Sequence, residues 1–227
     1  MSSDLIPLFG ALALGYLSGS VPNAVLIARL YGVQDIRRAG TGNPGAANVF
    51  RQVGPMPGLL VGLADMLKGA VPVAVAVQLL DLGAAEGAAT GAAAVLGHQF
   101  SVFLLFRGGA GLATTVGAIS MLLPVPFAIA AVIGVILAGA TRNMGWSGGS
   151  VLTLTFLFAF LLSQDVTRGV LPGGEATQDP AFILGGLALS LLLLFHFWTR
   201  LGMEWWRRRA GPTSGGPPAT EGPKSVA

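Results

Sequence analysis

Apolar residues fill this chain in long blocks, and that pattern restricts the fold more than any other feature. A helix crosses a bilayer with about 20 apolar residues. Apolar blocks of this kind lie at residues 5–30, 57–80, 87–106, 112–123, 126–140, 151–162 and 182–198. Charged residues make up only 10% of the 227-residue chain, against about 25% in soluble domains. We therefore predict an all-α integral membrane protein, built as a bundle of transmembrane helices.

Hydropathy alone leaves the number of spans at six or seven. Pro124 and Pro126 either separate two short helices or kink one long helix, because proline lacks a backbone donor and clashes with the preceding turn. Lys and Arg concentrate in cytoplasmic loops, and a path of seven spans puts nearly all the cations on one side and the acidic residues on the other. We predict about seven spans, with the N-terminus outside and the C-terminus in the cytoplasm.

Composition also divides the chain and excludes some chemistry. Residues 1–209 form the predicted transmembrane domain, whereas residues 210–227 are rich in Gly, Pro and Ser and are predicted to be a disordered cytoplasmic tail. The chain has no cysteine, which excludes disulfides, thiolate metal sites and thiol nucleophiles. Its two histidines, His98 and His196, make a multi-histidine metal site improbable. We predict no metal, no cofactor and no nucleic-acid partner.

One polar stretch, RRAGTGNPGAANVFR at residues 37–51, stands out against the apolar background. Its glycines permit positive φ, so several backbone N–H groups can converge on an anion. Donors and cations lie among them, namely Thr41, Asn43, Asn48, Arg37, Arg38 and Arg51. No GK[ST] follows, so it is not a Walker A loop. Spacing alone leaves two readings even, an anion-binding loop or a plain flexible, positively charged cytoplasmic loop.

Three further polar features are predicted on the cytoplasmic side. Ser20 lies within the first span, where a serine often only bonds a backbone carbonyl. Asp65 and Lys68 are three residues apart, hence on one helical face. Charges inside a span usually point into the bundle and mark a site, although these two could also simply neutralise each other or lie near enough to the interface for Lys68 to snorkel.

The last feature is LGHQFSVFLLFRGGAGLAT at residues 96–114. His98 and Ser101 are predicted on one face of a span that ends at Arg107 and a second glycine-rich turn. Two glycine turns with adjoining arginines on one membrane face indicate a pocket for a phosphorylated or otherwise anionic substrate at the inner leaflet.

The order and spacing of these motifs resemble the bacterial acyl-phosphate-dependent glycerol-3-phosphate acyltransferases, the PlsY family. The resemblance covers residues 5–117 well and rests mainly on hydropathy and His196 beyond them. It implies a multi-pass protein of the bacterial inner membrane with a cytoplasmic active face. The implied reaction moves a fatty acyl group from acyl phosphate to the 1-hydroxyl of glycerol 3-phosphate, giving lysophosphatidic acid and phosphate for phospholipid synthesis. Acyl phosphate is already activated, so positioning and charge stabilisation can supply much of the catalysis without a protein nucleophile.

The resemblance also implies roles for matching residues. Catalytic roles fall to Ser20, Arg37, Lys68 and His98, with His98 as a possible proton acceptor or phosphate donor. Asp65 would support the site. Phosphate binding falls to Thr41, Gly42, Asn43, Gly45, Asn48, Arg51, Ser101, Arg107, Gly108, Gly109, Gly111 and His196.

The chain departs from the family pattern at three positions. Ala110 replaces a lysine in the second glycine turn, Ala47 replaces a threonine in the first, and Thr199 stands roughly where an asparagine is expected after His196. Losing one charge-assisted phosphate contact costs about 1.5–3 kcal/mol, and Arg107 and Lys68 are the candidate cations to offset this loss. Two alternatives follow, a non-catalytic or regulatory homologue that binds a phosphorylated metabolite or an anionic lipid, and a small transporter. Against the transporter, the polar residues gather at one face and no repeat of the spans is evident.

Overall fold

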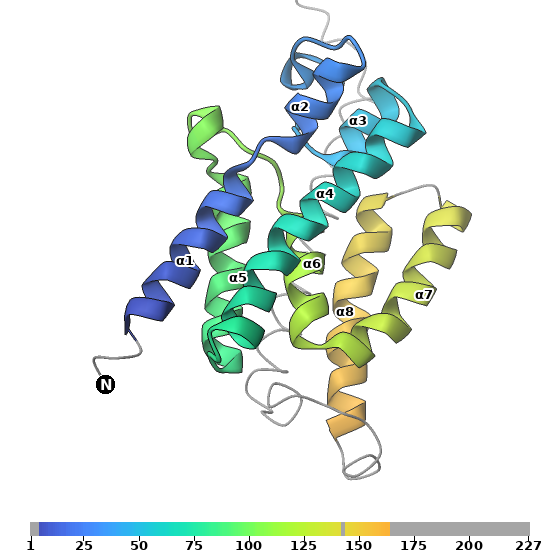
Figure 1. The fold of residues 1–227 in the computed structure, drawn as a ribbon. Coiled ribbons are helices and arrows are strands. Elements are labelled where there is room, and N and C mark those ends of the chain that lie inside the picture. Colours follow the sequence, from blue (N-terminus) through green and yellow to red (C-terminus); the bar gives the residue numbers. More distant parts are fainter. Residues whose placement is uncertain (1–4, 142–143, 164–227) are drawn as a thin grey trace, which may run out of the picture. The chain divides into compact units, whose positions relative to one another are not determined.

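The computed structural model describes residues 5–141 and 144–163, and every regular element in them is helical (Figure 1). The main helices pack as a bundle in which α1 lies against α5 and α4 against α6. In chain order the elements are α1 Leu5–Ser20, α2 Asn23–Leu30, the 3₁₀ turn η1 Ile36–Arg38, α3 Ala46–Gln52, α4 Pro55–Ala74, the π-helical η2 Val75–Leu79, α5 Ala84–Gln99, the 3₁₀ turn η3 Val102–Leu104, α6 Leu112–Leu122, α7 Pro124–Thr141 and α8 Met144–Ser163.

The predicted first span, residues 5–30, is long and apolar enough to cross a membrane, but its helix is interrupted. It breaks after Ser20, and the chain continues as α2 from Asn23. Pro22 lies at the break, where its missing N–H cannot continue the hydrogen bonding of α1. The break exposes backbone carbonyls in the middle of an apolar segment, and such groups need partners in a low-dielectric surrounding.

The third predicted span, residues 87–106, is wrong at its end. Helix α5 ends at Gln99, and the chain turns through η3 before α6 begins at Leu112. Leu105 and Phe106 adopt positive φ, 53° and 61°, which continues neither a helix nor a strand for residues with bulky side chains. The prediction followed the apolar composition, which does not distinguish a helical end from an apolar turn.

The proline-rich turn resolves as two helices. Helix α6 ends at Leu122 and α7 begins at Pro124, where a missing N–H costs nothing in the first turn of a helix. The separation agrees with the predicted path that places residues 112–123 and 126–140 in different spans. The seventh predicted span, residues 182–198, and the predicted tail both lie outside the described residues.

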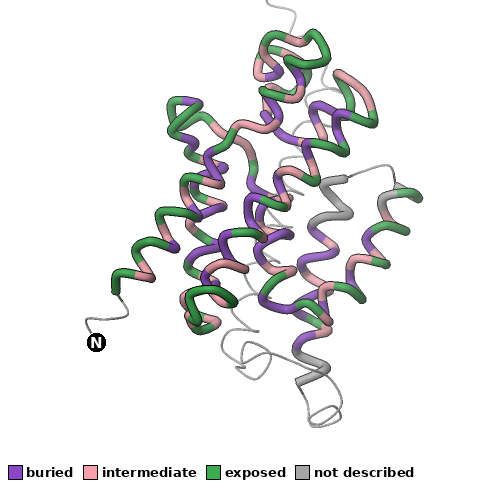
Figure 2. Tube along the Cα trace, viewed as in Figure 1, coloured by how far each residue is buried: buried purple, intermediate pink, exposed green. Residues whose placement is uncertain are grey.

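Exposed stretches run along the helices (Figure 2), and many of the exposed side chains are large and apolar, whereas several polar ones are buried. On α4, Asp65 and Lys68 are buried, at 2% and 8% exposure, whereas Leu63 and Leu67 are 49% and 59% exposed. Large apolar side chains are exposed along most of the helices, and surfaces of this extent mark contact with a membrane or a partner. By length and composition, the segments Leu5–Leu30 and Pro55–Leu79 can each cross a membrane, and three shorter apolar helices follow them.

Glycines allow the central helices to approach closely. A Cβ added at Gly19 of α1 would overlap the backbone carbonyl of Ala94 on α5, and one added at Gly69 of α4 would overlap the carbonyl of Thr114 on α6. Gly15 and Gly19 therefore let α1 approach α5 closely, as small residues do at helix contacts in membranes. These contacts fix α1, α4, α5 and α6 around the buried charges.

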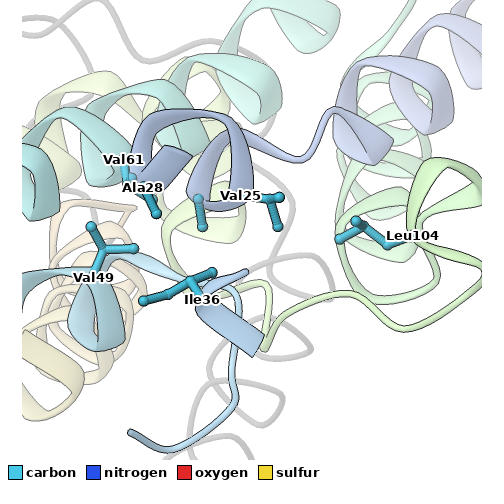
Figure 3. Close-up of a cluster of buried hydrophobic side chains, with 7 residues drawn as sticks. Val25, Ala28, Ile36, Val49, Val61 and Leu104 are labelled. Carbon is cyan, nitrogen blue, oxygen red and sulfur yellow. The ribbon is translucent and has the colours of Figure 1, made fainter. Parts of the chain in front are cut away.

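An apolar cluster packs against the chain segment between α1 and α4. It joins α2, η1, α3, α4 and η3 through Ala24, Val25, Ala28, Ile36, Val49, Val61 and Leu104 (Figure 3). Ile36 is fully buried although it lies between a loop and two arginines. The glycine-rich stretch of residues 37–51 is therefore anchored by this packed apolar cluster.

Candidate functional site

The first glycine loop is held by Asn48, which α3 places at its base. Thr41 N–H donates to Asn48 Oδ1 at 3.1 Å, and Asn48 Nδ2 donates to the carbonyls of Ile36 and Ala39 at 3.2 and 3.0 Å. Gly40 has φ 58° and lies so near Asn48 Oδ1 that a Cβ would collide with it. Asn48 is fully buried, and its side-chain amide forms hydrogen bonds only to the backbone of the loop and its flanks. It therefore supports the loop and is not an exposed donor. The loop is thus an ordered structure, in contrast to the plain flexible loop that the spacing left open.

Arg37 is paired with a carboxylate that the sequence reading missed. Its Nε and Nη2 donate to Asp35 Oδ1 and Oδ2, each at 3.0 Å, and its backbone N–H also donates to Oδ1 at 3.0 Å. These hydrogen bonds from Arg37, opposed by partial burial, lower the pKa of Asp35 below its usual value. A carboxylate two residues before an arginine at the start of a turn is a local signal that could have identified the pair.

The loop keeps other polar groups at its surface. Thr41 and Arg51 are exposed, and Asn43 is partly exposed, with its N–H 3.5 Å from Thr41 Oγ1. Gly42 has φ 73°, in the region that favours glycine, whereas Gly45 is extended and precedes α3. Ala47 is partly buried on α3.

Asp65 and Lys68 form the predicted pair at the break in the first span. Lys68 Nζ is 3.0 Å from Asp65 Oδ1 and donates to the carbonyl of Val21 at 2.9 Å. The break between α1 and α2 takes that carbonyl out of the regular helical pattern, and it accepts from both the Asn23 N–H, at 3.0 Å, and the lysine. The pair points into the bundle as predicted, and the snorkelling alternative is wrong because Lys68 is buried.

Asn23, at the start of α2, completes the buried cluster. Its Nδ2 donates to Asp65 Oδ1 at 3.1 Å. Asn23 was not predicted as a site residue, because its partner lies 42 residues away in the chain and no local pattern connects the two.

His98 lies on the last turn of α5, between Asp65 and the second glycine turn. Its Nδ1 is 3.9 Å from Asp65 Oδ1, and that buried nitrogen has no hydrogen-bond partner among residues 5–141 and 144–163. The N–H groups of Gly108 and Gly109 donate to the carbonyls of Gln99 and His98 at 2.9 and 3.0 Å. The second glycine turn therefore covers the C-terminal end of α5 and its histidine.

The two glycine turns meet at Gly109. A Cβ there would overlap His98 Nε2 and would lie 3.0 Å from the carbonyl oxygen of Pro44 in the first loop. The prediction that both turns gather at one place is confirmed by this contact, and Figure 1 shows the chain after α5 at the same end of the bundle as α2 and α3. Gly111, with φ 83°, ends the turn and begins α6.

The two predicted serines are bound within the scaffold. Ser20 Oγ donates to the carbonyl of Tyr16 at 2.8 Å, the pattern of a helical serine bonding its own helix. Ser101 Oγ donates to the Ser20 carbonyl at 2.5 Å. The placement of Ser101 on one helical face with His98 is wrong, since α5 ends two residues before it. Ser101 instead fastens the loop after α5 to the end of α1.

Ala110 stands exposed at the tip of the second turn, and its carbonyl accepts from Gln99 Nε2 at 3.2 Å. Lys68 is held by Asp65 and Val21, so it does not replace the missing lysine in this arrangement. Arg107 is exposed at the start of the turn and is the nearer substitute along the chain. His196 and Thr199 lie outside the described residues.

The groups available to bind an anion at this site are therefore two glycine turns, exposed arginines and one buried histidine. Arg51 from the first loop and Arg107 from the second turn can supply charge, and backbone N–H groups beside positive-φ glycines can supply donors. No group of three His, Cys, Asp or Glu side chains that could hold a metal ion occurs in residues 5–141 and 144–163.

Comparison with known proteins agrees with this geometry. Residues 9–202 match the family described as glycerol-3-phosphate acyltransferase. A protein of that name from Syntrophotalea carbinolica is 37% identical over 86% of this chain and 90% of its own length. Glycerol-3-phosphate acyltransferase 1 from Deinococcus radiodurans is 46% identical over 77% of this chain and 81% of its own.

Solved structures agree in fold. The crystal structure of PlsY, an integral membrane glycerol 3-phosphate acyltransferase, in its glycerol 3-phosphate form, superposes with a TM-score of 0.70 at 28% identity, over 91% of this chain and 94% of that one. The form with lysophosphatidic acid gives 0.68 at 27% identity, over 87% and 92%. With its exposed apolar side chains and apolar helices, this chain is an integral membrane protein, and it belongs to the glycerol-3-phosphate acyltransferase family.

Proposed function

We propose that this protein is a glycerol-3-phosphate acyltransferase that takes its acyl group from acyl phosphate. The observation that carries the proposal is the meeting of the two glycine turns at Gly109, beside His98, in a chain of this family. Both substrates carry a phosphate, and each turn offers backbone donors with an exposed arginine nearby. Neither a cofactor nor a protein nucleophile is needed, because phosphate is already a good leaving group.

The reaction follows from these groups. The 1-hydroxyl oxygen of glycerol 3-phosphate attacks the carbonyl carbon of acyl phosphate, and its proton passes to His98 Nε2. The new ester C–O bond forms as the bond to phosphate breaks, and the phosphate leaves with the electron pair. Arg51 and Arg107 stabilise the phosphates and the developing negative charge with cations that are in place before the reaction begins.

The remaining predicted site residues divide by role. Asn48, Gly42 and Gly45 shape the first loop, from which Thr41 and Asn43 face the phosphate. Arg37, held by Asp35, contributes charge at its start. Gly108, Gly109 and Gly111 form the second turn. Ser20, Ser101, Asp65 and Lys68 hold the surrounding scaffold, and His196 is proposed as a phosphate contact from the last span.

The proposed setting is the inner membrane of a bacterium, with seven spans, the N-terminus outside, the site on the cytoplasmic face and residues 210–227 as a disordered tail. Because the chain has no cysteine, single cysteines report its topology without background. Arg38→Cys in the first loop should react with an impermeant maleimide only in inside-out vesicles. Asp81→Cys, in the turn between α4 and α5, should react only in right-side-out vesicles. The same sidedness for both would refute this topology.

The activity test uses purified protein in detergent with acyl phosphate and glycerol 3-phosphate. Release of phosphate with formation of lysophosphatidate supports the proposal, as does rescue of a bacterial strain lacking its own enzyme of this type. His98→Gln should lower kcat by about 100-fold if it accepts the proton. Binding of glycerol 3-phosphate without turnover would instead support a regulatory homologue, and flux into liposomes without acylation would support a transporter.

A further inference from the structure

One oxygen in the bundle collects three nitrogen groups from three helices. Asp65 Oδ1, on α4, accepts from Asn23 Nδ2 at 3.1 Å and pairs with Lys68 Nζ at 3.0 Å. His98 Nδ1, on α5, faces the same oxygen at 3.9 Å. Lys68 already balances the charge of Asp65, so this carboxylate is not an uncompensated buried charge. Two donors fix its position, and the histidine is the third group around it.

Within the part of the chain that the structure describes, the nitrogen that faces Asp65 has no other partner. His98 is 7% exposed, and Nδ1 is buried without a hydrogen bond. A neutral imidazole carries its one proton on either Nδ1 or Nε2, and the other nitrogen then presents a lone pair. A lone pair on Nδ1 would face a carboxylate oxygen in a low-dielectric interior. The partial negative charge on that nitrogen would then be repelled by the negative carboxylate. An N–H there would face the same oxygen favourably.

The other edge of the imidazole faces the site. His98 Nε2 lies where a Cβ on Gly109 would have to be, and the same point is close to the carbonyl of Pro44. Only glycine leaves that space, so the second turn is shaped around this nitrogen. The histidine thus spans from the buried carboxylate to the junction of the two glycine turns.

We propose that Asp65 is a positioning residue that holds the proton of neutral His98 on Nδ1. The lone pair of Nε2 is then directed at the junction of the turns, where it accepts the proton of the substrate hydroxyl. The imidazolium formed in that step returns its proton to the released phosphate. Asn23 and Lys68 act through Asp65 by fixing its carboxylate. The catalytic part of this inference rests on the proposed acyltransferase function, whereas the location of the proton does not.

Nitrogen-15 spectra test the proton directly. With only two histidines in the chain, protein labelled with ¹⁵N-histidine gives few signals, and His98→Gln identifies those of His98. In the wild-type protein at neutral pH, we expect Nδ1 to resonate as a protonated nitrogen and Nε2 as an unprotonated one. The proton on Nε2 in the wild-type protein would overturn the proposal.

Asp65→Asn removes the charge and keeps the shape of the side chain. The His98 signals should then report a mixture of both tautomers, and kcat should fall about 10- to 100-fold while KM for glycerol 3-phosphate changes by less than about threefold. An unchanged tautomer in the variant would overturn the proposal. If the wild-type protein is active, an unchanged kcat in the variant would overturn it too. If the single variant does not fold, Asp65→Asn combined with Lys68→Met removes both buried charges together, and its tautomer is interpreted in the same way.

Thr90→Val provides a matched control on the same helix. Thr90 is fully buried and its hydroxyl only donates to the carbonyl of Glu86, so the His98 tautomer and kcat should stay as in the wild-type protein. A tautomer change in this control would show that any disturbance of α5 moves the proton, and would refute the specific role of Asp65. If wild-type protein shows the Nδ1 proton but no turnover, the proposed function fails and the Asp65–His98 link stands.

Discussion

Alanine substitutions at two glycines of α1 should have opposite effects on stability. A Cβ at Gly10 meets nothing within 4 Å, whereas one at Gly19 overlaps the carbonyl group of Ala94 on α5. Both replacements gain the same helix propensity, about 0.5–1 kcal/mol. The difference between the two variants therefore isolates the steric cost.

The magnitude follows from what must move at Gly19. The overlapping atoms are backbone atoms of a neighbouring helix, so no flexible side chain can yield, and overpacking of this kind costs about 1–3 kcal/mol. We expect Gly10→Ala to be neutral or slightly stabilising and Gly19→Ala to lie about 2 kcal/mol below it. In a chain of this size that difference corresponds to about 4–8 °C in Tm.

Thermal unfolding of the two purified variants in the same detergent, followed by loss of the monodisperse peak in size-exclusion chromatography, measures the difference. A third variant, Gly97→Ala, tests the α5 side of the same contact, where a Cβ would overlap the carbonyl of Tyr16. It should behave like Gly19→Ala. Equal Tm values for Gly10→Ala and Gly19→Ala would show that α1 and α5 are not packed as closely as the structure has them.

Three further predictions concern the glycine turns. Ala110→Lys should raise kcat/KM for glycerol 3-phosphate by about tenfold, since a charge-assisted phosphate contact contributes about 1.5–3 kcal/mol, whereas Ala110→Met should not; no gain with lysine would mean that the second turn binds phosphate in another way. Asn48→Asp should lower stability by about 2–4 kcal/mol in thermal unfolding, because a carboxylate cannot donate to the carbonyls of Ile36 and Ala39; Asn43→Asp, in the same loop, should change Tm little, and equal losses would contradict the role given to Asn48. Asp35→Asn should raise KM for glycerol 3-phosphate several-fold, since Arg37 loses its partner, and should lower stability by less than about 1 kcal/mol because the pair is partly exposed. The pKa of Asp35 is lowered in the folded protein, so the stabilisation is complete above the unfolded pKa of about 3.9 and is lost as pH falls through the folded value; a stability difference between variant and wild type that varies between pH 5 and 8 would contradict this assignment.

Local patterns in the sequence were enough for much of the fold and part of the site. The apolar blocks predicted the membrane helices, because a span must be apolar over a length set by the bilayer. The spacing of Asp65 and Lys68 predicted their shared face, since residues three apart on a helix are neighbours. The two glycine-rich stretches predicted turns that could receive an anion, because glycine alone adopts positive φ at little cost.

Hydropathy could not locate where apolar chain stops being helical. The break at Pro22 and the turn after Gln99 both lie within apolar stretches, and both were predicted as continuous spans. In each case another part of the chain satisfies the backbone groups that the end of the helix leaves free. Lys68 donates to the carbonyl of Val21, and the N–H groups of the second glycine turn donate to carbonyls at the end of α5.

Only the tertiary structure decided which polar groups meet. Asn23 reaches Asp65 across 42 residues, and Ser101 reaches the Ser20 carbonyl across 81. Such contacts depend on helices packing at glycine surfaces, and no local periodicity encodes which helices pack together. The sequence by itself determined that the chain enters a membrane and carries two turns suited to phosphate. The packing of α1, α4 and α5 determined that both turns and His98 converge on one point beside a buried carboxylate, because a partner in three dimensions is fixed by the whole fold.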